Sequence, residues 1–364
     1  MTPDPGLASW LRLTLTPGLG AASIRELLKQ FGLPENVLAR PRRELAQIAP
    51  RATVSAIDSE EVSRGVAAAL AWAQKPGHAL VTLADRDYPK LLLEIPDPPP
   101  LVYASGRLEL LNRPSLAIVG SRNATAQGER NAESFARTFS ENGLCIVSGL
   151  ALGIDAAAHR GGLVGAGSTI AVLGTGIDIV YPARNAELAG EIARAGLLLS
   201  EFPLGSKASA HNFPRRNRLI SGLTLGCLVV EAALASGSLI TARAAAEQGR
   251  DVFAVPGSIH SPLSKGCHAL IKSGAKLVES AEDVLAELSA FRRTGYASTA
   301  HSPPSAGASE DEALLMHMGF DPVDVDSLCS RAGLSPEQVS SELLRLELAG
   351  RIAALPGGLY QRLN

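Results

Sequence analysis

The sequence predicts an α/β protein whose central domain is a doubly wound parallel sheet with helices on both faces. Between residues 115 and 291, short apolar runs rich in Val, Ile and Leu alternate with amphipathic or Ala-rich stretches. Such runs are typical of strands buried on both faces, and the helical segments between them favour parallel pairing. The composition agrees, because 46% of the residues are hydrophobic and the 35 glycines suit many tight turns.

Seven apolar runs are expected to form the strands of this sheet. In chain order they are SLAIVG at 115–120, GLCIVSG at 143–149, STIAVLG at 168–174, GLLLSE at 196–201, GCLVVEA at 226–232, DVFAVPG at 251–257 and AKLVE at 275–279. The stretches between them, such as QGERNAESFARTFSEN and SLITARAAAEQG, have helical patterns. The earlier stretch 77–114 contains ALVTL and IPDPPPLVYASG, and its prolines limit it to edge strands or a lead-in.

The length of 364 residues predicts two or three domains. Residues 1–74 contain LASWLRLTL, the turn PGLG at 17–20 and ASIRELLKQFG, which predicts a small helix-hairpin-helix (SAM-like) domain. Such hairpins can hold a phosphate on backbone N–H groups, but plain packing is the favoured interpretation here. The α/β domain then covers 75–291, and residues 292–309 have the Ser, Ala, Gly and Pro composition of a flexible linker.

Residues 310–364 have the pattern of a winged-helix domain. Helices are expected around EALLMHM, VDSLCSRAG and SPEQVSSELLRLELAG, followed by a hairpin that turns at PGG. Ser335 and Gln338 form a capping box, Pro336 occupies the first helical position and Gly350 ends the helix. The domain has four arginines against nine acidic residues, a net charge of −5, so we expect protein contact or self-association rather than DNA reading.

The net charge of −2 excludes a global positive field, so any site for nucleic acid must be local. The N-terminus lacks a basic region, Arg12 interrupts its apolar stretch, and no apolar run reaches the length of a membrane helix. Four cysteines without C-x-x-C spacing indicate buried thiols in a reducing compartment. We therefore expect a cytoplasmic protein that does not insert into a membrane.

Six of the predicted strands end in polar or glycine-rich turns, namely GSRNAT, SGLALGID, GTGID, SEFPLG, EAALASGS and VPGSIHS. In a parallel sheet these turns meet at the carboxyl edge, where helix N-termini favour anions, so a phosphate-bearing ligand is expected. The first turn reads VGSRNATAQG rather than G-x-G-x-x-G, which disfavours NAD and FAD. No P-loop, G-x-S-x-G or H-E-x-x-H motif occurs, so no cofactor and no metal are expected.

The segment 202–230 contains no acidic residue but carries Lys207, Arg215, Arg216 and Arg218. Four cations without acidic neighbours beside a glycine-rich rim predict a phosphate-binding surface. Phe213 adjoins them, and an aromatic face next to positive charge is typical of single-strand binding, where bases stack without sequence preference. The alternative assigns Phe213 to the core and the arginines to solvent.

Two other interpretations concern catalysis and partners. Asp155 and His159 are four residues apart and could form an acid–base pair, although capping and decoration of a helix is favoured. Glu231 ends a strand, and Rossmann-like enzymes that cleave nucleotide N-glycosidic bonds use such a glutamate, but their PGGxGTxxE signature is absent. A third possibility is a scaffold whose basic surface binds an acidic protein.

Five segments together resemble the DprA/Smf family of bacterial DNA-processing proteins: AIVGSRNAT at 117–125, SGLALGIDAAAH at 148–159, AVLGTGIDIVYP at 171–182, FPRRNRLISGLT at 213–224 and SGSLITARAAAEQGRDVFAVPGS at 236–258. The resemblance implies a Rossmann-like domain that binds single-stranded DNA. It also implies protection of incoming DNA in natural transformation and loading of a RecA-type recombinase, without catalysis.

The family's G-S/T-R motif contacts DNA phosphates, and it corresponds to Gly120, Ser121 and Arg122. Its FPxRNR segment carries over as a DNA-binding role to Phe213, Arg215, Asn217 and Arg218. Arg216 occupies the variable position, so its role and that of Lys207 rest on local charge alone. The resemblance further implies a homodimer formed through the Rossmann-like domain.

Overall fold

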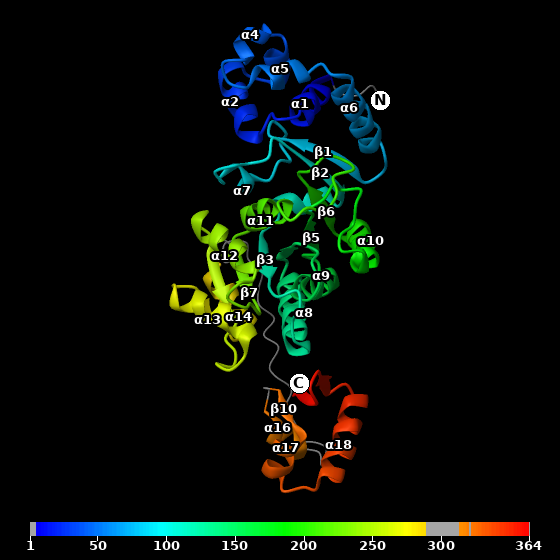
Figure 1. Ribbon diagram of the computed structural model, residues 1–364, viewed down its shortest axis with the longest axis vertical. Coiled ribbons are helices and arrows are strands. Elements are labelled where there is room, and N and C mark those ends of the chain that lie inside the picture. The colour runs from blue at the N-terminus through cyan, green and yellow to red at the C-terminus, as the bar shows by residue number, and fades with distance from the viewer. Residues whose placement is uncertain (1–4, 289–312, 320–321, 364) are drawn as a thin grey trace.

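The structure is a computed structural model, and it describes residues 5–288, 313–319 and 322–363. A helical region at the N-terminus, a nine-stranded α/β domain and a small C-terminal domain follow one another along the long axis of the molecule (Figure 1). The predicted linker 292–309 lies outside the described residues. Within the described ranges, no helix is both long and apolar enough to span a membrane.

The central sheet confirms the predicted doubly wound α/β architecture. Its spatial order is β1-β2-β6-β5-β4-β3-β7-β8-β9, and the order of the parallel strands reverses between β3 and β7. The strands are β1 (His78–Thr82), β2 (Leu101–Gly106), β3 (Ser115–Val119), β4 (Cys145–Ser148), β5 (Thr169–Val172), β6 (Leu197–Ser200), β7 (Gly226–Val229), β8 (Asp251–Ala254) and β9 (Lys276–Leu277).

The stretch 77–114 supplies the two antiparallel strands of the sheet. β1 is an edge strand, as expected, but β2 pairs with both β1 and β6, so the expectation that the prolines limit this stretch to edge strands is wrong for β2. The prolines next to β2 precede it, because their run ends at Pro100 and β2 begins at Leu101. They therefore remove no donor from the ladder of β2.

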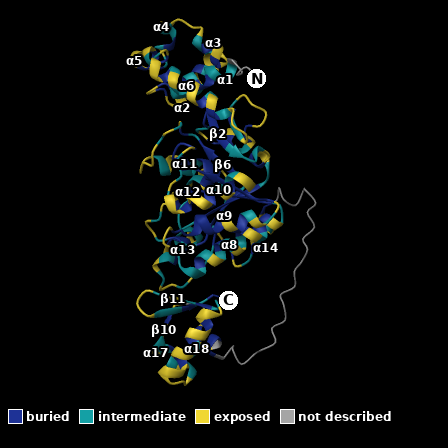
Figure 2. Cartoon of the chain, turned by 90° about the vertical axis from the view of Figure 1, so that its right-hand side faces the viewer, coloured by how far each residue is buried: buried dark blue, intermediate teal, exposed yellow. Residues whose placement is uncertain are grey.

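Helices cover both faces of the sheet. Alternate residues of each strand face opposite sides, so that Ala117 and Val119 pack against α11 and α12 while Leu116 and Ile118 pack against α8 and α9. The strands form the buried centre seen in Figure 2. The helices of this domain are α7 (Lys90–Leu93), α8 (Ala126–Glu141), α9 (Ile154–Val164), α10 (Ala186–Ala195), α11 (Asn212–Gly222), α12 (Ser238–Glu247), α13 (Lys265–Lys272) and α14 (Ala281–Glu287), with 3₁₀ turns η1 (Leu108–Asn112), η2 (Ala183–Asn185) and η3 (Pro262–Ser264).

The N-terminal region contains six helices and a hydrophobic cluster of its own. They are α1 (Pro5–Leu15), α2 (Ala21–Phe31), α3 (Pro34–Leu38), α4 (Arg42–Leu45), α5 (Arg51–Ala56) and α6 (Glu60–Ala73). α1 and α2 form the predicted hairpin, and Gly18 in its turn has φ +77°. Trp10 of α1 and Trp72 of α6, however, pack in one cluster with Tyr103 of β2. We therefore propose that the boundary at 74–75 separates two segments of the chain that still share one hydrophobic cluster.

The C-terminal region has the winged-helix arrangement that the sequence predicted. Helices α16 (Ala313–Met318), α17 (Val325–Ala332) and α18 (Pro336–Leu348) pack on a sheet of β10 (Val323–Asp324), β12 (Leu359–Arg362) and β11 (Ile352–Leu355). Both hydrogen bonds of the capping box between Ser335 and Gln338 are present. Arg130 of α8 donates a hydrogen bond to the carbonyl of Gly350 (3.1 Å), so this region contacts the α/β domain.

Candidate nucleic-acid interface

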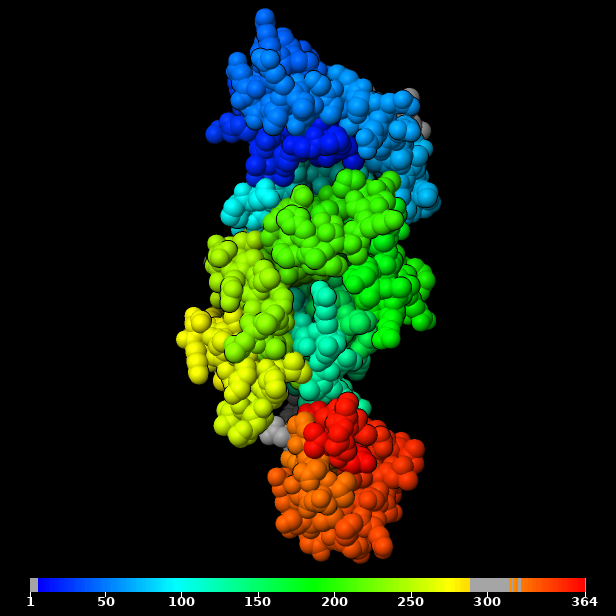
Figure 3. Space-filling view, in the orientation of Figure 1, coloured from blue at the N-terminus to red at the C-terminus, as the bar shows by residue number. Residues whose placement is uncertain are grey.

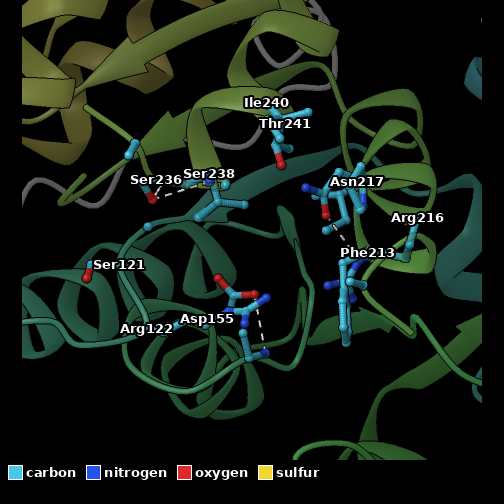
Figure 4. Close-up of a pocket in the computed structure, with 18 of the residues that line it drawn as sticks. Ser121, Arg122, Asp155, Phe213, Arg216, Asn217, Ser236, Ser238, Ile240 and Thr241 are labelled. Atoms are coloured by element: carbon cyan, nitrogen blue, oxygen red, sulfur yellow. Dashed lines mark hydrogen bonds between the residues drawn. The ribbon is translucent and has the colours of Figure 1, made fainter. Parts of the chain in front are cut away.

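A cleft opens at the carboxyl ends of β3 and β7, where the strand order reverses. Its volume is about 890 Å³, which is ample for a nucleotide. The turns after β3, β4 and β7, the segment 208–210 after β6, and α11 line it (Figure 4). Open α/β sheets bind their ligands at this position, because loops diverge there and helix N-termini face the opening. Three of the six turns predicted for the rim, those after β3, β4 and β7, therefore line a concave surface, whereas GTGID, SEFPLG and VPGSIHS lie outside its lining.

The loop between β3 and α8 places Gly120, Ser121 and Arg122 in the wall of the cleft. The Ser121 amide donates to the carbonyl of Glu231 (2.7 Å), and the Ser121 carbonyl accepts from the amide of Ile154 (3.2 Å). A Cβ on Gly120 would lie 2.8 Å from the Glu231 carbonyl oxygen and 2.6 Å from the Ile154 side chain. Only glycine fits between these two neighbours, so the loop is held firmly and Arg122 extends from a fixed backbone.

Arg122 and Phe213 meet across the cleft. The Arg122 guanidinium carbon is 5.4 Å from the centre of the Phe213 ring, a cation–π distance. The ring of Tyr181 lies 5.6 Å from the same ring, and all three side chains line the cleft. Gly174 lies behind Phe213, because a Cβ there would approach the ring to 2.9 Å. Phe213 is half-buried in the cleft wall rather than a core residue.

Arg216 lies at the floor of the cleft with only 4% of its surface exposed. Its guanidinium donates to the carbonyls of Gly149 (2.6 Å) and Val172, and its Nε donates to Asn217 (3.2 Å). Burial lowers the pKa of Arg216 to about 10, while the Asp155 carboxylate opposes that shift, so the side chain stays charged at neutral pH. It is a fixed interior cation rather than part of an exposed surface. Position by position, FPxRNR over 213–218 puts the variable position at Arg215, so its assignment to Arg216 is wrong.

The expectation of cations without acidic partners is wrong for Arg215 and Arg218. Both donate to Glu201 at the end of β6, at 3.0 Å and 2.5 Å, and Arg218 also pairs with Asp97 (3.6 Å). The Glu201 side chain is 1% exposed, and its burial raises its pKa although both arginines oppose the shift. The segment itself lacks acids, but the fold brings two carboxylates to it from outside.

Lys207 and Asn217 complete the set of predicted residues. Lys207 is exposed in the loop after β6, next to the cleft-lining segment 208–210. Within the described ranges it forms no ion pair. Asn217 lines the cleft beside Arg216, which uses its carbonyl oxygen as an acceptor. The structure thus brings Gly120, Ser121, Arg122, Phe213, Arg216 and Asn217 into the lining, whereas Lys207, Arg215 and Arg218 lie outside it.

Sequence reasoning missed the contribution of three cleft residues. Asp155 accepts hydrogen bonds from the amides of Gly149 (3.1 Å) and Ala151 (3.3 Å), and its burial raises its pKa while Arg216 opposes the shift. Tyr181 lines the cleft beside Phe213. Ser238 begins α12, whose N-cap, Gly237, has no side chain to cap the helix. These residues belong to the sequence segments IDAAAH, VYP and SGS, but no pattern of neighbouring residues predicted that the three segments would line the same cleft.

The proposed acid–base pair is absent, because His159 and Asp155 have separate partners. His159 bonds to the hydroxyl of Thr169 (2.7 Å) and to the amide of Leu150 (3.3 Å), and its burial lowers its pKa to about 3. Both side chains have structural tasks, but the expectation that they cap and decorate the helix is wrong, because the N-cap of α9 is Gly153 and both side chains are buried. Among the described residues, no cluster of His, Cys, Asp and Glu has the geometry of a metal site.

Glu231, the residue behind the glycosidase interpretation, has a structural task. Its carboxylate accepts from the backbone amide (2.9 Å) and the hydroxyl (2.6 Å) of Thr125. Thr125 in turn caps α8 by accepting from the amide of Gly128. A Cβ on Gly128 would lie 2.3 Å from the Glu231 carboxyl carbon, so the carboxylate is packed against the helix. Glu231 braces the loop that carries Arg122.

The comparisons with known proteins agree with this arrangement. The sequence family described as DNA recombination-mediator protein A matches residues 79–289, and the DprA winged helix domain matches residues 298–358. The chain is 44% identical over 310 residues to Protein Smf of Escherichia coli, covering 83% of this chain and 82% of that protein. It is 51% identical over 206 residues to DNA processing protein DprA of Streptococcus pneumoniae, covering 57% of this chain and 73% of the relative.

Solved structures show the same fold. DNA processing protein A from S. pneumoniae superposes with a TM-score of 0.66 and 41% identity, covering 76% of this chain and 95% of that one. A structure that describes the single-stranded DNA binding mode of DNA processing protein A from Helicobacter pylori superposes with a TM-score of 0.53 and 32% identity, covering 57% and 95%. Fold and sequence therefore define a Rossmann-like DNA-processing protein. The chain belongs to the DprA/Smf family of DNA-processing proteins.

Proposed function

We propose that this protein binds single-stranded DNA in the cleft at the end of β3 and β7. The carrying observation is the exposed Arg122 guanidinium 5.4 Å from the half-buried ring of Phe213, both in the lining of that cleft. A cation beside an aromatic face offers a phosphate contact and a stacking surface together. The H. pylori relative, whose structure concerns single-strand binding, supports the same ligand class.

Each wall of the cleft has a separate task in this proposal. Arg122 and the backbone of Gly120 and Ser121 receive phosphate, because the loop holds them rigidly and charge attracts the backbone without reading sequence. Phe213 and Tyr181 offer rings on which bases stack. The buried Arg216 adds a fixed positive potential at the floor that solvent screens weakly.

Arg215 and Arg218 act differently, as a framework that carries one surplus positive charge. Two guanidinium groups share Glu201, and Arg218 also contacts Asp97, which pairs with Arg25 at 2.6 Å. Arg215 has 46% of its side chain exposed, compared with 16% for Arg218. We expect Arg215 to reach phosphate while it keeps its contact with Glu201, and Lys207 to add long-range attraction.

Fluorescence anisotropy with a labelled oligo-dT tests the proposal when it is run across a salt series beside a duplex of equal length. The affinity should fall as salt rises, with log K changing by roughly 0.7 per log unit of salt for each phosphate neutralised. The single strand should bind more tightly, since stacked base pairs cannot offer their faces to Phe213. Salt-independent binding or a preference for the duplex would refute the proposal.

Family membership supports a proposal for the cellular role. We propose that the protein shields incoming single-stranded DNA from nucleases, loads a RecA-type recombinase onto it, and acts as a homodimer that joins two clefts. The description of the family as a recombination mediator supports this role. Sedimentation of the full chain with and without oligo-dT, and nuclease digestion of a protein-coated strand in the presence of recombinase, test the assembly and the loading separately.

A further inference from the structure

The wall of the cleft that α12 forms carries neither a cation nor an aromatic ring. α12 and the turn before it contribute Ser236, Gly237, Ser238, Ile240 and Thr241 to the lining. In Figure 3 the segment that contains α12 (yellow-green), the segment that contains α11 (green) and the segment after β3 (teal) meet on one face of the molecule. The α12 wall therefore borders the same opening as the loop after β3.

The positive end of α12 opens into the cleft. The helix is 10 residues long, and its N-cap is the exposed Gly237, which has no side chain to accept a hydrogen bond from the first amides. The first turn contains no acidic residue. The hydroxyls of Ser236 and Ser238 lie 2.7 Å apart beside it, and such a pair needs only one of its two hydrogens for itself. These features favour an anion.

A buried hydroxyl at the end of the first turn of α12 also lacks a partner. Thr241 is 1% exposed, and its hydroxyl forms no hydrogen bond within the described residues. Thr224, after α11, instead donates to the carbonyls of Ile220 and Ser221. Figure 4 shows the Thr241 oxygen turned into the cleft, to which it is open rather than sealed in the core. Because a buried polar group is costly without a partner, this hydroxyl points to a ligand.

Asn217 of α11 adds a donor to this wall. Its carbonyl oxygen accepts from Arg216 Nε (3.2 Å), so the amide nitrogen is left as the free end of the side chain. Asn217 lines the cleft, and α11 packs against α12. Among the described residues of the lining, Asp155 is the one acid, and Figure 4 shows it beside Arg122 rather than beside Thr241. The α12 wall therefore offers donors without negative charge, as a phosphate requires.

We infer that the N-terminus of α12, the Thr241 hydroxyl and the Asn217 amide bind a second phosphate of the DNA strand. The inference rests on the proposed function, because it divides the same cleft between two phosphates, one at the loop with Arg122 and one at α12. A phosphate oxygen accepts hydrogen bonds from amides and hydroxyls, so it satisfies the Thr241 hydroxyl and the positive end of the helix together.

Gly237→Asp in the full-length chain tests the preference of this wall for an anion. No atom lies within 4 Å of a Cβ at Gly237 and its φ is −62°, so a side chain fits. A carboxylate at this position repels phosphate but stabilises the helix N-terminus, so unfolding does not explain lost binding. Gly20→Asp is the matched control, because Gly20 is the N-cap of α2, is equally open and lies outside the cleft lining.

Thr241→Val tests the hydroxyl. Valine keeps the branched shape of threonine and removes the donor without a change of charge, whereas Thr241→Ser keeps the donor. Thr53→Val is the matched control, because Thr53 is also buried, with 8% of its surface exposed, and lies on α5 outside the cleft lining.

Binding is measured by anisotropy across a salt series with oligo-dT and oligo-dC of about 20 nucleotides. Gly237→Asp should weaken binding about tenfold at low salt, and the loss should shrink as salt rises, because salt screens the added charge. Thr241→Val should weaken binding about three- to tenfold at every salt concentration, while Thr241→Ser restores most of the affinity. Both controls should bind as the unsubstituted chain does. The losses should be equal for the two oligomers, because a phosphate contact carries no base identity.

The outcomes separate this inference from the function on which it rests. If Gly237→Asp and Thr241→Val bind as the unsubstituted chain does while Arg122→Ala loses affinity, the phosphate site at α12 is refuted and the proposed function stands. If the unsubstituted chain shows no salt-dependent binding, the proposed function itself fails. An equal loss with Gly20→Asp would overturn the inference, because the position of the charge would not matter. A loss confined to one oligomer would also overturn it, because α12 would then contact a base.

Discussion

Two segments bring arginines to the same end of the sheet, and they hold them in different ways. Arg122, on the loop after β3, is exposed above the Phe213 ring. Arg216 and Arg218, on α11, are tied to backbone carbonyls or to carboxylates. The loop is therefore suited to contact a mobile phosphate, whereas the helix supplies a stationary field and a framework. A guanidinium contributes to binding according to its surroundings as well as its charge.

Removal of Arg216 should have the largest effect of these substitutions, and the effect should be on stability. Arg216→Ala leaves the carbonyls of Gly149 and Val172 without their donor and the Asp155 carboxylate without its nearby cation. We expect the free energy of unfolding to fall by about 3–5 kcal/mol in urea denaturation. The matched substitution Arg215→Ala removes a half-exposed guanidinium, and Glu201 keeps its partner Arg218, so it should cost less than about 1 kcal/mol. Equal losses would show that the two arginines are not held differently.

The dry surroundings of Arg216 can be checked through pH, because His159 is buried nearby with its pKa lowered to about 3 from 6.5. Below pH 6.5 the unfolded chain binds a proton at His159 that the folded chain refuses until about pH 3. The stability from this group is complete above pH 6.5 and falls by about 1.4 kcal/mol per pH unit below it, roughly 2 kcal/mol at pH 5.

Urea denaturation between pH 7.5 and 5 measures this dependence, with His159→Gln as the comparison. The glutamine does not titrate. Below pH 6.5, the free energy of unfolding of the variant should therefore fall less steeply with decreasing pH, by about 1.4 kcal/mol per pH unit. An unchanged slope would mean that His159 takes up its proton in the folded state. Water would then reach the surroundings of Arg216, and Arg216 would no longer differ in solvent access from Arg122 on the exposed loop.

Arg122→Ala should reduce the affinity for oligo-dT about tenfold and flatten the salt slope by roughly 0.7, since one phosphate contact and one cation–π contact are lost. The free energy of unfolding should change little, because the side chain is exposed. Arg40→Ala is a matched control, since Arg40 also lies 5.4 Å from a phenylalanine ring, that of Phe31, in the helical region. If both substitutions reduce DNA affinity equally, the loop has no special role.

Glu201→Gln should have the smallest effect, and of opposite sign. Glutamine keeps the shape of the side chain but removes the negative charge that Arg215 and Arg218 share. The affinity for oligo-dT at low salt should rise about two- to threefold, as expected for one more uncompensated charge near the strand. Anisotropy at two salt concentrations measures it, and a decrease would indicate that Glu201 orients the arginines more than it neutralises them.

Local patterns were sufficient to predict much of this molecule. The runs from SLAIVG to GCLVVEA became β3 to β7 because each is apolar enough to be buried on both faces. DVFAVPG and AKLVE became β8 and the exposed edge strand β9. The GSRNAT turn could be placed in the cleft, because it follows β3 and the turns after parallel strands all lie at the carboxyl edge of the sheet. The capping box of α18 and the turn at Gly350 needed nothing beyond neighbouring residues.

Other features depended on residues far apart in the chain. Asp97 reaches Arg218 across 121 positions, and α1 and α6 join the core beneath β2 although they precede it as a separate helical region. A search for acids within 202–230 could not detect these ion pairs, because Glu201 lies at the end of β6 and Asp97 in a proline-rich loop, both outside that segment.

The sequence by itself determined the strand and helix pattern, the glycine-rich edge and the positions of the cations, because these follow from side-chain polarity and from contacts between near neighbours. Only the tertiary structure decided which arginines remain available to a phosphate. Charge is a property of one residue, but its neutralisation depends on distance, and folding sets the distances between residues that the chain keeps far apart.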